Sequence, residues 1–445
     1  MGGRIMLALV MGVGLAAPGA SAATVEELER QVEAQGKLIS ELQRQVHALH
    51  QTRGAQPEGA AAADESAPST WPERAQEFSR QGASPALGGV GTKPFLVDFG
   101  KRAYLGGYAD LEYKDSESGN AAFRQHRLIP FIYADVSERV KFATEIEFEY
   151  GGPDNNASDG EVKVEFATID YLLTEAANLR AGIVLSPLGK LNAVHDSPLQ
   201  DLTERPLVNQ FIIPTTLSEA GAGLFGSFAP TDLSQVSYEA YLVNGFSGLT
   251  GESAANVMIS RASGLRSARG SQKSDLNDEP ALVGRVAVSP FLGLEVGGST
   301  HIGAYDTRGD NMLGIYVLDA TWQHGPFELL AEGAYAAIEK NALADSLGVP
   351  DDLYGYYVQG NYHFMPQALR SWAPKVFTDE SIFTLVNRWD WVNLDGNRTQ
   401  RYTLGLNFRP REETVLKTDF QFNEESGLLD SIDDNAFLVS VATYF

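Results

Sequence analysis

The side chains that could contact a solute gather in one long segment, residues 187–219, and at alternate positions of two later segments. The long segment carries amide, imidazole, carboxylate and guanidinium groups at Asn192, His195, Asp196, Asp201, Glu204 and Arg205. Arg388 and Arg401 each lie in a run where polar and apolar residues alternate. Charged rings of this kind select among ions and orient dipolar solutes without breaking bonds. The predicted chemistry is therefore binding and selection.

Motifs for catalysis or for metal binding are missing from the sequence. There is no Gly-x-Ser-x-Gly and no His-Glu-x-x-His, and the chain has no cysteine, which excludes thiol catalysis, disulfides and thiolate metal sites. His195 beside Asp196 is interpreted as a hydrogen-bonding pair in a loop. No tight metal-ligand spacing occurs. The sequence predicts a protein that is not an enzyme, has no catalytic residues and needs no cofactor or metal.

The net charge of -24, from 58 acidic and 34 basic residues, argues against binding of nucleic acid. Several acidic residues cluster in segments that read as loops, for example 424–434. Solvation of the loops is the favoured interpretation. Bridging of lipopolysaccharide through divalent cations is the alternative.

The strongest structural signal is alternation of apolar and polar residues, clearest in 140–150. Val140, Phe142, Ile146 and Phe148 share one face there, and Lys141, Glu145 and Glu147 share the other. This is a lipid face and a wet face at a period of two residues. The last eleven residues, 435–445, alternate in the same way and end on Phe445, as the closing strand of an outer-membrane barrel does.

Sixteen such segments can be marked, joined alternately by short turns and longer loops. Segment 365–379 is the exception, because it should be a short turn and is long. An even strand number with this pattern of connections predicts an all-β, 16-stranded antiparallel transmembrane β-barrel over residues 94–445. Its phase directs one set of charged side chains to the lumen wall, among them Arg127, Glu145, Glu147 and Arg285.

Three segments precede the predicted barrel. Residues 1–22 have the basic, apolar and small-residue regions of a signal peptide. Residues 23–50 contain four heptads with Val25, Val32, Ile39 and Val46 at one core position, which predicts a short α-helical coiled coil. Residues 51–93 are rich in Ala, Gly, Pro and Ser and are interpreted as a flexible periplasmic linker. Chains are expected to associate through the coil, where Val or Ile at one core position and Leu at the other favour a dimer, whereas a barrel of this kind is normally a trimer.

The sequence resembles proteobacterial porins related to the phosphate-selective porin O and P family. The resemblance rests on Gly106-Gly107-Tyr108, the Leu-Asn-x-x-His segment at 191–195, Glu204-Arg205-Pro206 and Ile212-Ile-Pro-Thr-Thr216. It implies a trimeric sixteen-strand channel in the outer membrane of a Gram-negative bacterium, with the third extracellular loop folded inward. Phosphate selectivity is not expected, because the wall carries no ladder of lysines.

The predicted function is passive diffusion of small hydrophilic solutes or ions, with the third loop, 187–219, narrowing the lumen. Asp196, Asp201, Glu204 and Arg205 are expected inside, facing Arg388 and Arg401. Expected partners are outer-membrane lipid and lipopolysaccharide, other copies of the chain in a homotrimer, and peptidoglycan near the coil. The alternative is a structural tether that joins the outer membrane to the cell wall through the coiled coil.

Overall fold

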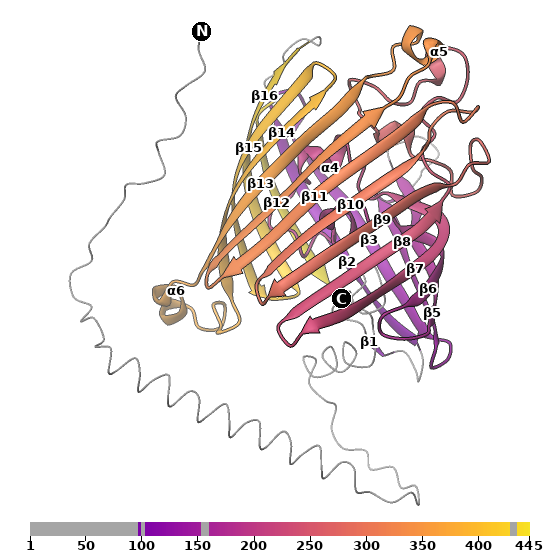
Figure 1. Cartoon of the computed structure of the whole chain (residues 1–445). Coiled ribbons are helices and arrows are strands. Elements are labelled where there is room, and N and C mark those ends of the chain that lie inside the picture. The colour runs from indigo at the N-terminus through magenta and orange to yellow at the C-terminus, as the bar shows by residue number, and fades with distance from the viewer. Residues whose placement is uncertain (1–96, 99–102, 153–159, 428–433) are drawn as a thin grey trace, which may run out of the picture. The chain divides into compact units, whose positions relative to one another are not determined.

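The computed structural model describes residues 97–98, 103–152, 160–427 and 434–445. Within these ranges the chain forms a closed ring of sixteen antiparallel strands, β2 to β17 (Figure 1). A two-residue strand, β1 (Val97–Asp98), pairs with β2 beside Tyr104 and Leu105. The predicted signal peptide, coiled-coil helix and linker lie outside the described residues.

The sixteen predicted strands are all present, and most bounds differ from the predicted ones by only a few residues. In order they are β2 (Ala103–Ser116), β3 (Ala122–Asp135), β4 (Val140–Glu149), β5 (Glu161–Leu172), β6 (Asn178–Leu185), β7 (Ser218–Thr231), β8 (Ser234–Val243), β9 (Ala281–Phe291), β10 (Leu294–Ala304), β11 (Met312–His324), β12 (Phe327–Ile338), β13 (Asp352–Phe364), β14 (Ile382–Leu394), β15 (Asn397–Arg411), β16 (Thr414–Ser426) and β17 (Ala436–Tyr444).

Short helices lie in the connections. They are α3 (Lys190–Ala193), α4 (Leu207–Phe211), η1 (Ala254–Asn256), η2 (Arg266–Ala268), α5 (Ala342–Ser346) and α6 (Gln367–Trp372). α6 accounts for the unexpected length of segment 365–379, and its Trp372 is exposed. In the described ranges no helix is both long and apolar enough to cross a membrane.

The ring closes because β17 pairs with β2 over its whole length, from Ala436 opposite Ser116 to Tyr444 opposite Tyr108. The last residue continues this pairing, since the Phe445 nitrogen donates to the Gly107 oxygen at 2.9 Å. A Cβ at Gly107 would lie 2.7 Å from the Phe445 ring and 2.5 Å from the Ile129 oxygen. Glycine is therefore required where the carboxy-terminal aromatic ring crosses β2.

Alternation along the strands separates an apolar outer surface from a polar interior. On β14, for example, Arg388 and Asp390 are buried, whereas Leu385 and Trp389 are exposed on the outside. Five strand pairs contain a register shift, and two of these shifts lie away from the turns. The pairing of β2 with β3 shifts between Asp110 and Leu111, and that of β4 with β5 shifts between Glu145 and Ile146. A residue added to one strand at such a bulge changes the direction of its side chain.

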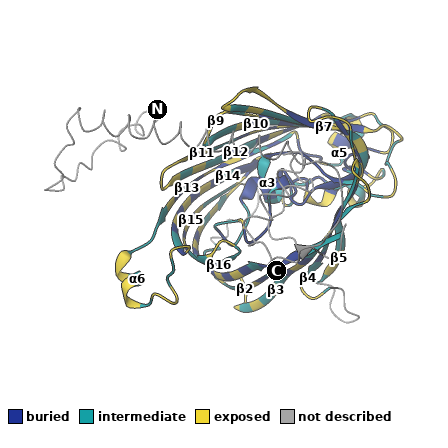
Figure 2. Cartoon of the chain, turned by 90° about the horizontal axis from the view of Figure 1, so that it is seen from below, coloured by how far each residue is buried: buried dark blue, intermediate teal, exposed yellow. Residues whose placement is uncertain are grey.

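The interior also contains an apolar core, which the sequence did not predict. Connections 186–217, 244–280 and 339–351 pack against inward-facing residues of β11 to β14. Its buried members include Leu188, Leu207, Val208, Ile212, Ile213, Phe246, Ile259, Leu265, Leu313, Ile315, Val317, Ile338, Val349, Leu353 and Val392. Figure 2 shows α3 within the ring of strands. The long connections therefore turn into the barrel.

Candidate functional site

The connection between β6 and β7, residues 186–217, is attached to β12 by a single carboxylate. Glu332 Oε2 accepts hydrogen bonds from the backbone nitrogens of Lys190 at 2.7 Å and Leu191 at 3.2 Å, at the start of α3. Its Oε1 accepts a hydrogen bond from Asn209 Nδ2 on α4 at 2.6 Å. Glu332 is buried, so its carboxylate oxygens need these donors. Both helices are thereby fixed to one wall residue.

Glu204 attaches the same connection to a second part of the wall, formed by β14, β15 and β2. Its Oε1 lies 2.7 Å from Lys114 Nζ on β2, and its Oε2 lies 3.0 Å from Arg401 Nη1 on β15. Arg388 Nη1 on β14 donates to the Glu204 backbone oxygen at 3.0 Å. Burial tends to raise the pKa of Glu204, but Arg401 and Lys114 outweigh this effect and lower the pKa to about 2. Glu204 is therefore ionised at neutral pH.

Asp201 forms the next polar contact. It accepts hydrogen bonds from Asn361 Nδ2 on β13 at 2.7 Å and from Asn407 Nδ2 on β15 at 3.0 Å, and it lies 3.3 Å from Arg409 Nη2. Lys417 on β16 donates to the Ser197 backbone oxygen at 2.8 Å. The stretch from Ser197 to Glu204 is thus bonded to six consecutive strands of the ring, β13 to β17 and β2, with Thr203 reaching Ser440 on β17.

Asn192 joins the two ends of the connection. Its Nδ2 donates to the backbone oxygens of Ser186 at 2.7 Å and Leu217 at 3.0 Å, and its Oδ1 accepts from the Leu217 nitrogen at 2.8 Å. Asn192 is fully buried. Because one side-chain amide satisfies three backbone groups, it holds together residues 186 and 217, where the connection leaves and rejoins the wall.

His195 and Asp196 are buried between the connection and the wall. His195 Nδ1 lies 2.9 Å from the Asn192 oxygen, which can only accept, so this nitrogen carries the hydrogen. Nε2 lies 3.4 Å from Glu165 Oε2 on β5. Burial lowers the pKa of His195, so the imidazole is neutral at neutral pH. Asp196 accepts a hydrogen bond from the Tyr444 hydroxyl at 2.8 Å.

The Arg205 side chain bonds within the loop, whereas its neighbour Glu204 bonds to the wall. Its Nη1 donates to the Thr215 oxygen at 2.7 Å. Burial and the nearby positive charge of Arg127 lower the pKa of Arg205 to about 10, which leaves it charged at neutral pH. Of the predicted facing pairs, the structure joins Glu204 to Arg388 and Arg401, whereas Arg205 bonds within its own connection.

The predicted wall residues are buried and paired. Arg127 lies 2.8 Å from Glu147 and 3.1 Å from Glu149. Glu145 accepts from the Tyr133 hydroxyl at 3.3 Å. Two more ion pairs lie along the wall, Arg285 with Asp319 and Arg388 with Asp390. The wall charges therefore form short local pairs instead of a row of one sign.

Sequence reasoning missed a basic group formed by Lys163 on β5 and by Arg266 and Arg269 in the connection 244–280. Lys163 Nζ donates to the Thr216 oxygen at 3.3 Å, and Arg266 Nη1 donates to the Thr215 oxygen at 3.4 Å. Arg269 is a neighbour of Arg266, and burial together with this like charge lowers the pKa of Arg269 to about 10. The only signal in the sequence was two arginines at 266 and 269 in a segment without periodicity.

A cavity of about 490 Å³ lies between the connection and the wall strands β11 to β13. It is lined by both signs of charge, including Lys190, Asp201, Asp319, Glu328, His363 and Arg409. Leu191, Leu330 and Tyr357 contribute apolar surface. Its lining includes residues beside the short turns, such as Gln323 and Glu412, at the rim that faces the periplasm in outer-membrane barrels.

Solved structures share this architecture. The outer membrane channel DcaP of Acinetobacter baumannii aligns over 79% of this chain and 99% of its own, with a TM-score of 0.50 and 11% identity. The anion-selective porin from Comamonas acidovorans aligns over 77% of this chain and 99% of its own, also with a TM-score of 0.50 and 11% identity. At this identity the likeness shows the fold. The fold is that of outer-membrane porins.

Sequence comparison gives the family. The family model described as "Phosphate-selective porin O and P" matches residues 104–424. An uncharacterized protein of Aquifex aeolicus is 30% identical over 362 residues, which cover 75% of this chain and 78% of that protein. The chain therefore belongs to the phosphate-selective porin O and P family. It is a non-enzymatic outer-membrane channel for small solutes.

Proposed function

We propose that the third extracellular loop, residues 187–219, narrows the lumen of this channel and sets which small hydrophilic solutes or ions diffuse through it. The observation that carries the proposal is that the loop leaves the wall between β6 and β7 and bonds to strands on the far side of the ring. Glu332 on β12 binds α3 and α4, while Lys114 on β2 and Arg401 on β15 bind Glu204. A loop attached on both sides crosses the path of a solute.

The proposed constriction consists of Asn192, His195, Asp196, Asp201, Glu204 and Arg205 on the loop, with Arg388 and Arg401 on the wall. Its charges have fixed positions because each is bonded to the wall or to the loop backbone. Opposite charges on the two sides of a narrow path make a transverse field, which is stronger next to a low-dielectric wall than in bulk water. Dipolar solutes and hydrated ions are oriented by such a field.

The experiment is single-channel recording in planar bilayers. Deletion of residues 192–205 removes the loop contacts to Lys114, Arg388, Arg401 and Arg409, and we expect a larger conductance. Heat-modifiable migration in gels shows whether the shortened barrel is folded. A folded deletion variant with the parent conductance would place the constriction elsewhere.

Selectivity provides a second readout. The double variant Arg388→Ala with Arg401→Ala removes two positive charges from beside Glu204, and we expect the reversal potential to move toward cation selectivity. Arg285→Ala is the control, because Arg285 on β9 is a wall arginine as buried as Arg388. It pairs with Asp319 on β11 and not with Glu204. An equal shift of the reversal potential in the control would show that Arg388 and Arg401 have no specific role in selectivity.

Assembly follows the family. We infer a homotrimer in the outer membrane, with association strengthened by the predicted coiled coil 23–50. Cross-linking of the full chain in detergent tests this state, and the same measurement on a variant without residues 23–90 tests the contribution of the coil. The tether function depends on residues that the structure does not describe, and it stays a prediction from the heptads.

A further inference from the structure

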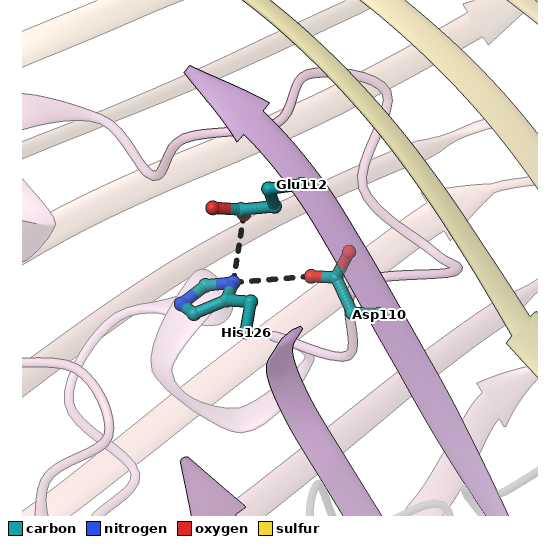
Figure 3. Close-up of side chains that lie close together, drawn as sticks. All are labelled: Asp110, Glu112 and His126. Carbon is teal, nitrogen blue, oxygen red and sulfur yellow. Dashed lines mark hydrogen bonds and ion pairs between the residues drawn. The ribbon is translucent and has the colours of Figure 1, made fainter. Parts of the chain in front are cut away.

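Two carboxylates and an imidazole converge on the inner face of β2 and β3. His126 Nδ1 lies 2.7 Å from Glu112 Oε1 and 3.1 Å from Asp110 Oδ2, and Figure 3 shows the imidazole between the two acidic side chains. Asp110 and Glu112 are two residues apart on β2, so alternation puts both on the same face. His126 comes from β3.

The bulge in the β2–β3 pair is what brings His126 to this point. Asp110 pairs with Arg127, but Leu111 pairs with Gln125, so His126 is the additional residue of β3. Gln125 and Leu128 are exposed on the outer surface, while His126 and Arg127 between them both turn inward. With regular pairing His126 would be opposite Leu111, which is on the lipid side. Bulges often re-aim one side chain in this way at binding sites.

The carboxylates at this point have more acceptor atoms than the surrounding protein can satisfy. His126 Nδ1 lies within hydrogen-bond distance of both Asp110 Oδ2 and Glu112 Oε1, and it carries at most one hydrogen. At least one of these two oxygens therefore lacks this donor, and Asp110 Oδ1 accepts no hydrogen bond from any described residue, although Glu112 is only 5% exposed and Asp110 only 2%. Buried carboxylate oxygens without donors are costly unless a cation compensates them.

The neighbouring cations are engaged elsewhere. Arg127 binds Glu147 and Glu149, and Lys417 donates to the backbone oxygens of Ser197 and Leu202. A divalent ion would balance the two charges of Asp110 and Glu112. The spacing fits, because cis ligands of an octahedral ion with bonds of about 2.1 Å are about 3.0 Å apart.

We propose that Asp110, Glu112 and His126 bind a divalent first-row transition-metal cation, with Nδ1 and one oxygen of each carboxylate as ligands. Imidazole with carboxylates suits zinc or manganese, whereas calcium prefers six to eight oxygen ligands. The site is accessible from the lumen, because the His126 side chain keeps 17% of its surface exposed. A similar group, Glu145, Glu165 and His195, is fully enclosed and therefore less suited to exchange an ion with solvent.

The test is titration of the metal-free full chain in detergent with Zn²⁺, followed by isothermal calorimetry. His126→Gln, Asp110→Asn and Glu112→Gln each remove one ligand and should weaken the saturable site by at least about tenfold, since even groups behind the ligands change metal affinity 10–100-fold. His363→Gln is the matched control, because His363 is a wall histidine with one carboxylate neighbour, Glu328 at 3.5 Å. Unchanged zinc affinity in all three ligand variants would overturn the proposal.

X-ray absorption at the zinc edge gives a second measurement that does not depend on the variants. The bound ion should show only nitrogen and oxygen ligands at about 2.0–2.2 Å. Loss of the imidazole contribution in folded His126→Gln protein supports the assignment, and an unchanged spectrum contradicts it. Folding of each variant is checked by heat-modifiable migration. Neither measurement uses conductance, so failure of the proposed constriction would leave this result standing.

Discussion

The two sides of the lumen hold the long loop by different means. The side formed by β11 to β14 packs apolar residues such as Ile315, Val317 and Val392 against α4 and its surroundings. The side formed by β2 to β5 and β15 to β17 presents charged residues such as Arg127, Arg401 and Lys417, which bond to acids or to backbone oxygens of the loop. One side excludes water from the loop, and the other fixes individual charges.

Magnitudes assign a separate task to each side. A buried leucine or isoleucine replaced by alanine costs about 2–5 kcal/mol, whereas one hydrogen bond to a charged group contributes about 1.5–3 kcal/mol net. Apolar contacts are also non-directional, so they do not determine where a carboxylate lies. The apolar side therefore contributes more attachment energy per truncated residue, and the polar side fixes the positions of the charges on the proposed path.

The largest effect is expected on the apolar side. Leu207→Ala truncates a buried side chain of α4 and should lower the free energy of local opening of the loop by about 2–5 kcal/mol. Amide hydrogen exchange of peptides from 187–217 measures this opening. Leu199→Ala is the control on the same loop, because Leu199 is 39% exposed and its truncation should change opening by less than about 0.5 kcal/mol. Equal effects of both variants on exchange would contradict the conclusion that buried apolar contacts hold the loop.

The next effect is expected at Glu204. Glu204→Gln keeps the size of the side chain but removes the charge that faces Arg401 and Lys114, and hydrogen bonds to charged groups contribute about 1.5–3 kcal/mol. Exchange should therefore accelerate in the stretch from Ser197 to Glu204 and remain unchanged in α4, which is fixed by Glu332. Acceleration over the whole loop would show that the two attachments are not separate.

Acid should reproduce this variant. The pKa of Glu204 is lowered from 4.5 to about 2, so its contribution is complete above about pH 4.5 and is lost as the pH falls toward 2. We expect the single-channel conductance of the parent protein to increase over this window as the loop is released. In Glu204→Gln the increase specific to this window should be absent. A conductance that is constant from pH 5 to pH 2 would contradict the role of the ionised carboxylate.

Period-two alternation was enough to predict the barrel. It located all sixteen strands, because a strand with lipid on one face and a polar lumen on the other must alternate. The same reasoning placed Arg388 and Arg401 on the inner face. The phase fails where a bulge adds a residue. Glu165 and His126 both turn inward at such positions, and strict alternation gives no sign of either.

The apolar core could not be predicted from the strands for a related reason. Leu313, Ile315 and Val317 face inward, so β11 is apolar on both faces over this stretch and loses the alternation that would mark its inner side. The segments that cover it, such as 244–280, have no periodicity. Contacts such as Glu332 with α3 join residues more than a hundred positions apart, and local spacing carries no information about them.

The smallest effect is expected for a variant that keeps the charge of Arg401 but changes the geometry of its hydrogen bonds. Arg401→Lys keeps the positive charge beside Glu204 but loses the planar guanidinium, whose Nε also donates to Asn423 Oδ1 at 2.6 Å. The hydrogen bond from Nε to the Asn423 amide is lost, but the charge beside Glu204 is kept, so the loss of local stability should be smaller than in Glu204→Gln. The reversal potential should stay at the parent value, because the path keeps the same charge at the same wall.

Arg401→Ala is the companion variant, and it removes both the charge and the hydrogen bonds. If charge determines selectivity, the alanine variant shifts the reversal potential toward cations and the lysine variant does not. If both variants shift the reversal potential equally, selectivity depends on the position of the loop, which the guanidinium geometry holds. The polar side would then act, like the apolar side, by attaching the loop. Planar-bilayer recordings in a salt gradient distinguish these two outcomes.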